Sequence, residues 1–346
     1  MSLPRYQPSE TYQWNYQHAP ACESFDEPLV PGQWDFCGLP VASPIGIAAG
    51  PLLNGSWCRY YAGLGFDVLT YKTVRSRCRF CYEMPNLQPV DCQVLDRQGT
   101  VLPAVSAMQD TWAVSFGMPS ADPKVWRRDV ELTRSQLPSG KILSVSVVGS
   151  VQADWSFAEI ANDYATCARW AVESGADVVE TNFSCPNVTT CDGQVYQVPK
   201  RAKQIAETVR QAIGETPYVV KIGYLPDEEL VDELIDAIDG SVTAIAMTNS
   251  IAAKVQQNGQ PMFVGHERGI CGAAIRDASI DQVSRFARAI KRRGSSLKLI
   301  GVGGIRSASD VQAYLSAGAH ACHLATAPMQ SPRVGLEIRE QLASER

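Results

Sequence analysis

The 346-residue chain lacks the features that define several large classes of protein. No stretch approaches the roughly 18 consecutive apolar residues that a membrane-spanning helix needs. The first 20 residues are polar and aromatic, unlike a signal peptide. The 31 basic and 36 acidic residues leave a formal net charge of −5 without a basic run, which argues against a nucleic-acid partner. We therefore expect a cytoplasmic protein with a small-molecule ligand.

The eleven cysteines are odd in number and lack the regular spacing of a disulfide framework, which agrees with a reducing compartment. Cys78 and Cys81 form a C-x-x-C with Cys92 close by, a pattern that invites a metal or iron–sulfur interpretation. A fourth ligand at matching spacing is missing, although Cys37 or Cys58 could approach in space. We interpret these cysteines as unligated thiols in a loop. No G-x-G-x-x-G motif indicates a second cofactor.

Eight short apolar segments have the character of buried parallel strands. Helical patterns or insertions separate them; one such helix, Phe157–Ser174, is stopped by Gly175. This regular alternation predicts an α/β fold of the (β/α)8 TIM-barrel type rather than a doubly wound sheet. The predicted strands are Ile45–Ala49, Asp67–Tyr71, Ile142–Val148, Asp177–Thr181, Tyr218–Val220, Val242–Met247, Leu297–Ile300 and His320–Leu324.

Two segments between strands are too long to be plain connections. Residues 73–121 and 251–279 both follow carboxyl ends of strands, so both insertions are expected over the mouth of the barrel. Within the first, Cys92–Leu95 and Thr100–Ala104 have the pattern of a small hairpin. Residues 1–35 are rich in proline and aromatics and show no regular period, which predicts an extended N-terminal arm over the body or a neighbouring subunit. The barrel would occupy residues 36–346.

Polar side chains follow the carboxyl ends of several strands, where an α/β barrel keeps its chemistry. A lysine is rarely buried unless it meets an anion or a polar ligand. Two lysines and two asparagines at equivalent strand ends therefore predict a binding site at the mouth. The side chains concerned are Lys72, Asn182, Cys185, Lys221, Asn249 and Ser250.

The seventh strand runs into Gly301–Ile305, a glycine-rich turn, and Ser307–Ser309 would cap the helix that follows. Exposed backbone N–H groups and a helix N-terminus together form a phosphate site. Because the phosphate site of a barrel lies at the loops after strands seven and eight, Ala325 and Thr326 are expected to complete it. The pattern predicts a phosphate-bearing cofactor.

Five stretches together resemble the dihydroorotate dehydrogenase family, whose catalytic domain is an FMN-binding barrel; they also resemble the barrel of dihydropyrimidine dehydrogenase. The resemblance covers residues 36 to 328. It implies a flavin-dependent oxidoreductase that acts on the C–C bond of a dihydropyrimidine-type ring, with dihydroorotate as the expected substrate and orotate as the product. The stretches are Cys37–Gly50, Asn182–Asn187, Thr248–Ser250, Gly269–Arg276 and Gly301–Ile305.

The resemblance also implies roles for individual residues. Cys185 would be the catalytic acid/base, since cysteine holds this position in the soluble class 1 enzymes and serine in the membrane-associated class 2 enzymes. FMN would accept the hydride, and Cys185 would handle the proton on the opposite face of the substrate. No metal site is expected. The implied substrate-binding set is Lys72, Asn182, Asn187, Asn249 and Ser250. The implied cofactor-binding set is Ala48, Ala49, Gly50, Lys72, Lys221, Gly272, Gly303, Gly304 and Thr326.

The chain departs from the family pattern near the expected substrate. Val114 stands where the family usually carries an asparagine that binds the substrate's carboxylate, and Leu53 replaces the class 2 substrate lysine. The segment RSRCRFCYEMPN replaces an arginine-rich Gly-Asn-Pro run after the second strand. These changes leave a uracil-like pyrimidine or related cyclic amide open as the substrate. A non-catalytic barrel that binds a phosphate-bearing ligand is a further alternative.

The sequence does not indicate the electron acceptor. Fumarate, a quinone and a separate flavoprotein partner all stay open. The aromatic arm and the class 1 resemblance favour a homodimer.

Overall fold

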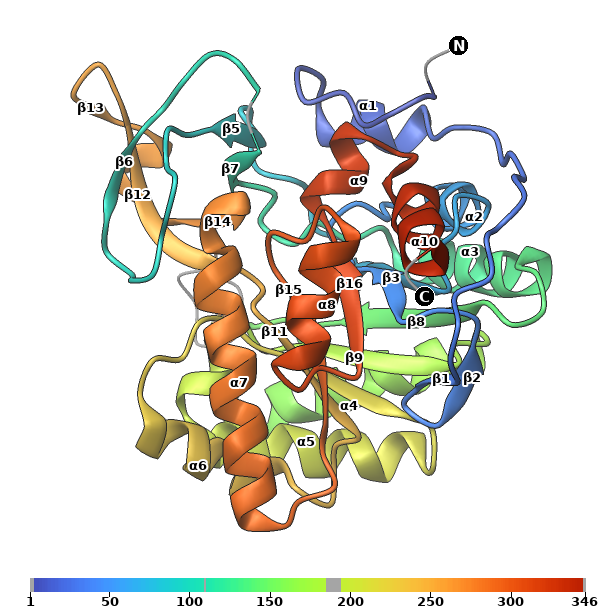
Figure 1. The fold of residues 1–346 in the computed structure, drawn as a ribbon. Helices are drawn as coiled ribbons and strands as arrows, with labels where there is room; N and C mark the ends of the chain where they lie inside the picture. Colours follow the sequence, from blue (N-terminus) through green and yellow to red (C-terminus); the bar gives the residue numbers. More distant parts are fainter. Residues whose placement is uncertain (1–2, 109, 185–193, 345–346) are drawn as a thin grey trace.

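Eight parallel strands form a closed barrel at the centre of the molecule (Figure 1). The structure, a computed structural model, describes residues 3–108, 110–184 and 194–344. The strands are hydrogen-bonded in chain order, and the last one closes on the first. The TIM-barrel prediction is confirmed, and each predicted strand is present. The barrel strands are β3 (Ile45–Ile47), β4 (Val68–Val74), β8 (Ile142–Val147), β9 (Val178–Asn182), β10 (Tyr218–Lys221), β11 (Ala244–Met247), β15 (Lys298–Val302) and β16 (Ala321–Leu324).

Helices cover the outside of the barrel, and several begin or end at residues suited to that position. The carboxylate of Asp122 accepts from the Lys124 N–H at the start of α3. Ser156 and Glu159 form a capping box at the start of α4. Gly294, with a left-handed backbone, ends α7. The helices are α2 (Gly55–Ala62), α3 (Pro123–Gln136), α4 (Phe157–Glu173), α5 (Pro199–Ile213), α6 (Glu228–Ile238), α7 (Arg276–Arg293), α8 (Ala308–Ser316), α9 (Thr326–Gln330) and α10 (Val334–Ser344).

The interior of the barrel near its base, at the amino ends of the strands, is filled by apolar side chains. Inward-facing residues such as Val68, Ile142 and Val178 form one buried cluster there. A hairpin of β1 (Trp34–Phe36) and β2 (Leu39–Val41) lies beside it. The Phe36 ring from this hairpin stacks on the His323 ring, with 5.2 Å between the centroids. Ligand chemistry is therefore confined to the opposite end, the mouth.

The two insertions form a second sheet, which lies apart from the barrel strands on one side of Figure 1. Its strand order is β13-β12-β14-β7-β5, with β6 paired to β12. The insertions thus assemble with each other, although more than 100 residues separate them. The strands are β5 (Leu87–Pro89), β6 (Val101–Pro103), β7 (Thr111–Val114), β12 (Ile251–Gln257), β13 (Gln260–Pro261) and β14 (Arg268–Gly272); the short 3-10 turns are η1 (Val195–Gln197), η2 (Phe263–Gly265) and η3 (Ala273–Ile275).

The predicted hairpin within the first insertion is wrong. Cys92–Leu95 is not a strand, and β6 pairs in parallel with β12 instead. The Leu95 N–H donates to the Ala274 carbonyl, 2.8 Å away, in the second insertion. Both limbs of the expected hairpin therefore bind the other insertion rather than each other. Sequence-local patterning cannot reveal such a distant partner.

The N-terminal arm lies over the body of the same chain. Tyr6 and Tyr12 are buried, and both contact the Phe116 ring edge-on. The arm contains one helix that the sequence did not predict, α1 (Tyr12–Gln17), whose first turn is capped by Thr11. Among the described residues, no helix combines the length and the apolar character that crossing a membrane requires.

Candidate active site

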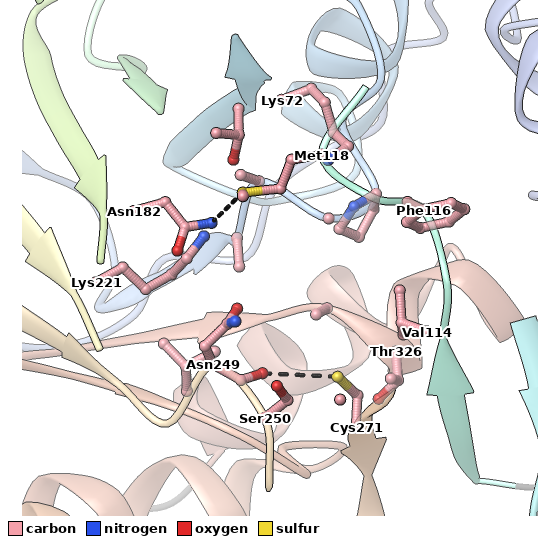
Figure 2. A pocket seen from close by; sticks show the side chains of 18 of the residues that line it. Lys72, Val114, Phe116, Met118, Asn182, Lys221, Asn249, Ser250, Cys271 and Thr326 are labelled. Carbon is pink, nitrogen blue, oxygen red and sulfur yellow. Dashed lines mark hydrogen bonds between the residues drawn. The ribbon is translucent and has the colours of Figure 1, made fainter. Parts of the chain in front are cut away.

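The carboxyl ends of the barrel strands surround a pocket of about 860 Å³, including the open solvent at its entrance (Figure 2). Residues from seven barrel-strand ends and from the insertion sheet meet there. The predicted residues that line the pocket are Ala48, Ala49, Gly50, Lys72, Asn182, Lys221, Asn249, Ser250, Ala325 and Thr326. The predicted Gly272, Gly303 and Gly304 are not among its lining residues.

Both strand-end lysines are buried and reach the pocket. The Lys221 ammonium lies 3.0 Å from the Oε1 atom of Glu180, which is on the neighbouring strand β9. The Lys72 ammonium lies 5.7 Å from the centre of the Phe116 ring, within range of a cation–π contact. In Figure 2 the two lysines approach the cavity from different strands. The pocket therefore presents two cations to a ligand.

An amide-rich wall lines one side of the pocket. The Asn182 side-chain amide donates to the Met118 sulfur at 3.7 Å, and its carbonyl oxygen accepts from the Ser184 N–H at 3.0 Å. The Asn249 side-chain amide donates to the Ser184 carbonyl at 2.8 Å. These contacts fix the two asparagine side chains before any ligand binds, and Ser250 lies beside Asn249 (Figure 2). Fixed amides of this kind suit a flat ring that carries carbonyl and N–H groups.

The opposite wall is apolar and comes from the first insertion. Val114 ends β7, where it pairs with Gly269 of β14, and its side chain faces the cavity together with Phe116. Met118 adopts a positive φ of 52°, which turns the chain back toward Asn182. From the sequence, Val114 stands out in this stretch only as the position of the missing asparagine. No asparagine of the described residues replaces Val114 on this wall.

Gly272, Gly303 and Gly304 form a tight backbone cradle, which follows the pocket residue Val302. A Cβ atom on Gly304 would lie 2.6 Å from the Arg276 Cβ and 2.9 Å from the Gly272 carbonyl oxygen. Gly303 has a φ of +127° and Gly304 a φ of +68°. Only glycine fits at both positions, because a Cβ atom would collide with Ser279 or Arg276. This geometry, with polar Thr326 at the pocket edge, fits the phosphate end of a flavin nucleotide.

Two predicted residues, Cys185 and Asn187, lie outside the described residues. A different cysteine, Cys271, lines the pocket, and its thiol lies 3.6 Å from the Asn249 carbonyl oxygen. Burial raises the pKa of Cys271 to about 12, and the nearby Lys221 charge offsets only part of this shift. Cys271 therefore stays a protonated thiol near neutral pH, which makes it a poor acid/base.

The C-x-x-C segment lies away from this pocket. Cys78, Cys81 and Cys92 are free thiols; Cys78 is exposed and the other two are half-buried. In the part of the chain that the structure describes, no three His, Cys, Asp or Glu side chains are placed to hold a metal ion.

Sequence reasoning missed Phe116, Met118 and Cys271, which line the pocket, and Glu180, which pairs with Lys221. Glu180 lies in an apolar strand, yet Val178, Glu180 and Asn182 alternate along β9 and so share one face. The two-residue period could have placed Glu180 inside the barrel, directly below Asn182.

Residues 33–345 match the family model described as dihydroorotate dehydrogenase. The chain belongs to this family. It is therefore a flavin-dependent oxidoreductase acting on a CH–CH bond. The chain is 33% identical to a dihydroorotate dehydrogenase of Dictyostelium discoideum, over 97% of each chain.

Other relatives differ in the acceptor that their names state. The chain is 27% identical to the catalytic subunit of an NAD(+)-type dihydroorotate dehydrogenase B from Solidesulfovibrio magneticus, over 88% of this chain and 90% of that one. It is also 27% identical to a quinone-type enzyme of Bordetella avium, over 87% and 81%. A crystal structure of the Eimeria tenella enzyme with ferulenol shares the fold, with a TM-score of 0.73, 17% identity and 95% and 88% coverage.

Proposed function

We propose that the pocket at the barrel mouth is where this enzyme oxidises dihydroorotate to orotate, with FMN as the hydride acceptor. The observation that carries the proposal is the meeting of two features in one pocket: buried Lys72 and Lys221, and the fixed amides of Asn182 and Asn249. The glycine cradle follows directly on Val302, which lines the same pocket. FMN, when bound, supplies the hydride-accepting ring. We assign this chemistry to the cytoplasm, with a homodimer as the expected assembly.

In this proposal the glycine cradle of Gly272, Gly303 and Gly304 holds the cofactor's phosphate with Thr326. Arg276 and Ser279 pack against the turn, so glycine is required there and the backbone N–H groups are the donors we assign to the phosphate. Lys221 contributes a positive charge to the cofactor side of the pocket, and the small residues Ala48 and Ala49 leave room for a flat ring.

The substrate's ring would lie against the amide-rich wall. Asn182, Asn249 and Ser250 bind its carbonyl and N–H groups, which apolar contacts cannot orient. Lys72 faces the same space and supplies the cation nearest the Phe116 wall. We further assign Asn187 to this set from the family motif, since it lies outside the described residues.

The proton is assigned to Cys185. Oxidation of the ring removes one hydride and one proton, so the protein must supply a base on the face opposite the flavin. Cys271, the pocket cysteine among the described residues, has a pKa of about 12 and is unsuited to the role. The family motif at Asn182–Asn187 therefore leaves Cys185 as the candidate.

A second candidate substrate is a uracil-like ring without a carboxylate. It is favoured by Val114, which places an apolar side chain on the wall where the family's carboxylate-binding asparagine usually stands. Lys72 is available to either ligand, so it does not distinguish them.

The test is anaerobic mixing of the purified holoenzyme with dihydroorotate, dihydrouracil and dihydrothymine. We expect dihydroorotate to bleach the flavin absorbance fastest. Bleaching by dihydrouracil alone would transfer the assignment to the second candidate, and a colourless protein that releases no flavin on denaturation would reject both. Reoxidation of the bleached enzyme by fumarate, a quinone or NAD(+) would then identify the acceptor.

A further inference from the structure

The floor of the pocket contains a buried ion pair inside the barrel. Glu180 is 2% exposed and Lys221 is 4% exposed. Their charged atoms lie 3.0 Å apart, bridging the adjacent strands β9 and β10. Lys221 lines the pocket, whereas Glu180 is not among its lining residues. Glu180 therefore contacts the pocket through Lys221.

The surroundings of this pair contain few other charges. His323, on β16, is fully buried, and neither of its ring nitrogens has a hydrogen-bond partner among the described residues. Burial lowers the pKa of His323 to about 3, with a smaller contribution from the Lys221 charge. The imidazole is therefore neutral at physiological pH. The Glu180 carboxylate is left to compensate the Lys221 ammonium.

The hydrogen bonding of the pair is incomplete among the described residues. Glu180 Oε1, the atom nearest the ammonium, has no aligned hydrogen bond among the described residues. A pair serving stability alone normally has its remaining hydrogen-bonding capacity satisfied, because desolvation of both ions is otherwise uncompensated. A Lys221 ammonium held from below by a single carboxylate keeps donors available for a ligand above it.

We propose that Glu180 is a positioning residue, which holds the Lys221 ammonium at the pocket floor and compensates its charge, and thereby sets the reduction potential of the bound flavin. This inference rests on the proposed function for the presence of the cofactor. The inference goes beyond the proposed function because it assigns a role to Glu180, a residue that touches neither cofactor nor substrate.

The sign of the effect follows from electrostatics. Reduction adds negative charge to a flavin, and a nearby cation stabilises that charge more when no carboxylate compensates it. Glu180→Gln keeps the side-chain shape and removes the negative charge. The flavin bound to Glu180→Gln therefore has a higher reduction potential than the flavin of the wild type. At a given applied potential, we expect the ratio of reduced to oxidised flavin to rise at least tenfold. For a two-electron couple, a tenfold change corresponds to about 30 mV.

The experiment measures the flavin reduction potential of the holoenzyme by equilibration with redox dyes. Four proteins form a cycle: wild type, Glu180→Gln, Lys221→Met and the double variant. We expect an upward shift for Glu180→Gln alone and no further change when it is added to Lys221→Met. Glu180→Asp, which keeps the charge, stays close to wild type. Asp129→Asn is the matched control, because this carboxylate bonds Tyr71 and Gly55 outside the barrel interior and its loss leaves the potential unchanged.

An unchanged or lowered potential in Glu180→Gln would overturn the proposal. So would an upward shift of the same size in the Lys221→Met background, because Glu180 would then act independently of Lys221. If Glu180→Gln alone folds poorly, two other variants still test the proposal. They are the double variant, in which both charges are removed together, and Glu180→Asp. Dye equilibration needs no substrate, so failure of the dihydroorotate assignment would be seen separately.

Discussion

The two ends of the barrel each bury charged side chains, but the two charge clusters are built differently. At the base, Asp67 accepts from Lys141 at 2.9 Å, from Arg339 at 3.0 Å and from Ser43 at 2.5 Å. Glu27, from the N-terminal arm, adds a second carboxylate 2.7 Å from Lys141. At the mouth, Lys221 has Glu180 as its ion-pair partner.

This difference separates stability from function. The base cluster joins the N-terminal arm, the starts of β4 and β8, and the C-terminal helix α10, and its carboxylate oxygens are hydrogen-bonded. The mouth pair leaves hydrogen-bonding capacity directed at a cavity. In barrels of this type, the base maintains the fold and the mouth carries the chemistry. Changes at the mouth should therefore alter flavin and substrate chemistry, and changes at the base should alter unfolding.

The largest effect at the mouth is expected for Gly304→Asp. The new carboxylate would meet the phosphate of the cofactor, and its Cβ would lie 2.6 Å from the Arg276 Cβ. We expect the protein to be purified almost without flavin, as measured by absorbance of the denatured supernatant. Gly240→Asp is the matched control, because Gly240 also has a positive φ, +77°, but no atom within 4 Å of the new Cβ. Normal flavin content in Gly304→Asp would contradict the phosphate site.

Cys185→Ala is expected to slow flavin reduction by ~10²–10⁴-fold, the usual effect of removing a positioned proton-transfer group. Flavin content should stay normal, because the thiol has no role in holding the cofactor. Cys185→Ser should retain part of the activity only at higher pH, since a hydroxyl gives up its proton less readily than a thiol. Single-turnover bleaching across pH measures all three proteins. A Cys185→Ala enzyme with the wild-type rate would remove this assignment.

At the base, Arg339→Leu should lower the stability of the fold and leave the flavin chemistry unchanged. Arg339 is buried, and its loss leaves the Asp67 carboxylate and the Glu27 contact without one of their cations. Breaking a buried ion pair on one side costs about 3–5 kcal/mol of unfolding free energy. Chemical denaturation would measure this cost, with exposed Arg333→Leu as the control. A stable Arg339→Leu protein with a changed flavin potential would break the comparison between the two ends.

The smallest expected effect concerns Val114→Asn, which sharpens the description of the mouth. A charge-assisted hydrogen bond to the substrate's carboxylate contributes ~1.5–3 kcal/mol, so the new side chain should tighten dihydroorotate binding by roughly ten- to a hundredfold. Binding of dihydrouracil, which has no carboxylate, should not improve. Equal changes for both ligands would show that position 114 does not face the carboxylate. Anaerobic titration of the flavin spectrum gives both affinities.

The sequence predicts the barrel well because each strand and helix has its own local signal. Val145 and Val179, for example, lie in apolar runs bounded by helices with clear caps and glycine stops. The strand-end position of Lys72, Asn182 and Lys221 then places them at one mouth without further information. Position in a regular fold was enough to bring these residues together.

The insertions and the pair at the pocket floor could not be predicted in the same way. β6 pairs with β12, a partner about 150 residues away, so its local hairpin pattern was misleading. α1 is a six-residue helix whose buried Tyr12 packs on Phe116, a tertiary contact without a sequence signal. The contact of Glu180 with Lys221 depends on the register of two adjacent strands, which only the structure provides.

The measurement that tests the central claim most directly is a single anaerobic turnover of the wild-type holoenzyme with dihydroorotate. Flavin bleaching and orotate absorbance are followed together, with dihydrouracil as the comparison substrate. The account predicts complete bleaching with one orotate formed for each flavin reduced. Flavin that stays oxidised in dihydroorotate, while a chemical reductant still bleaches it, would contradict the assignment of this pocket to dihydroorotate oxidation.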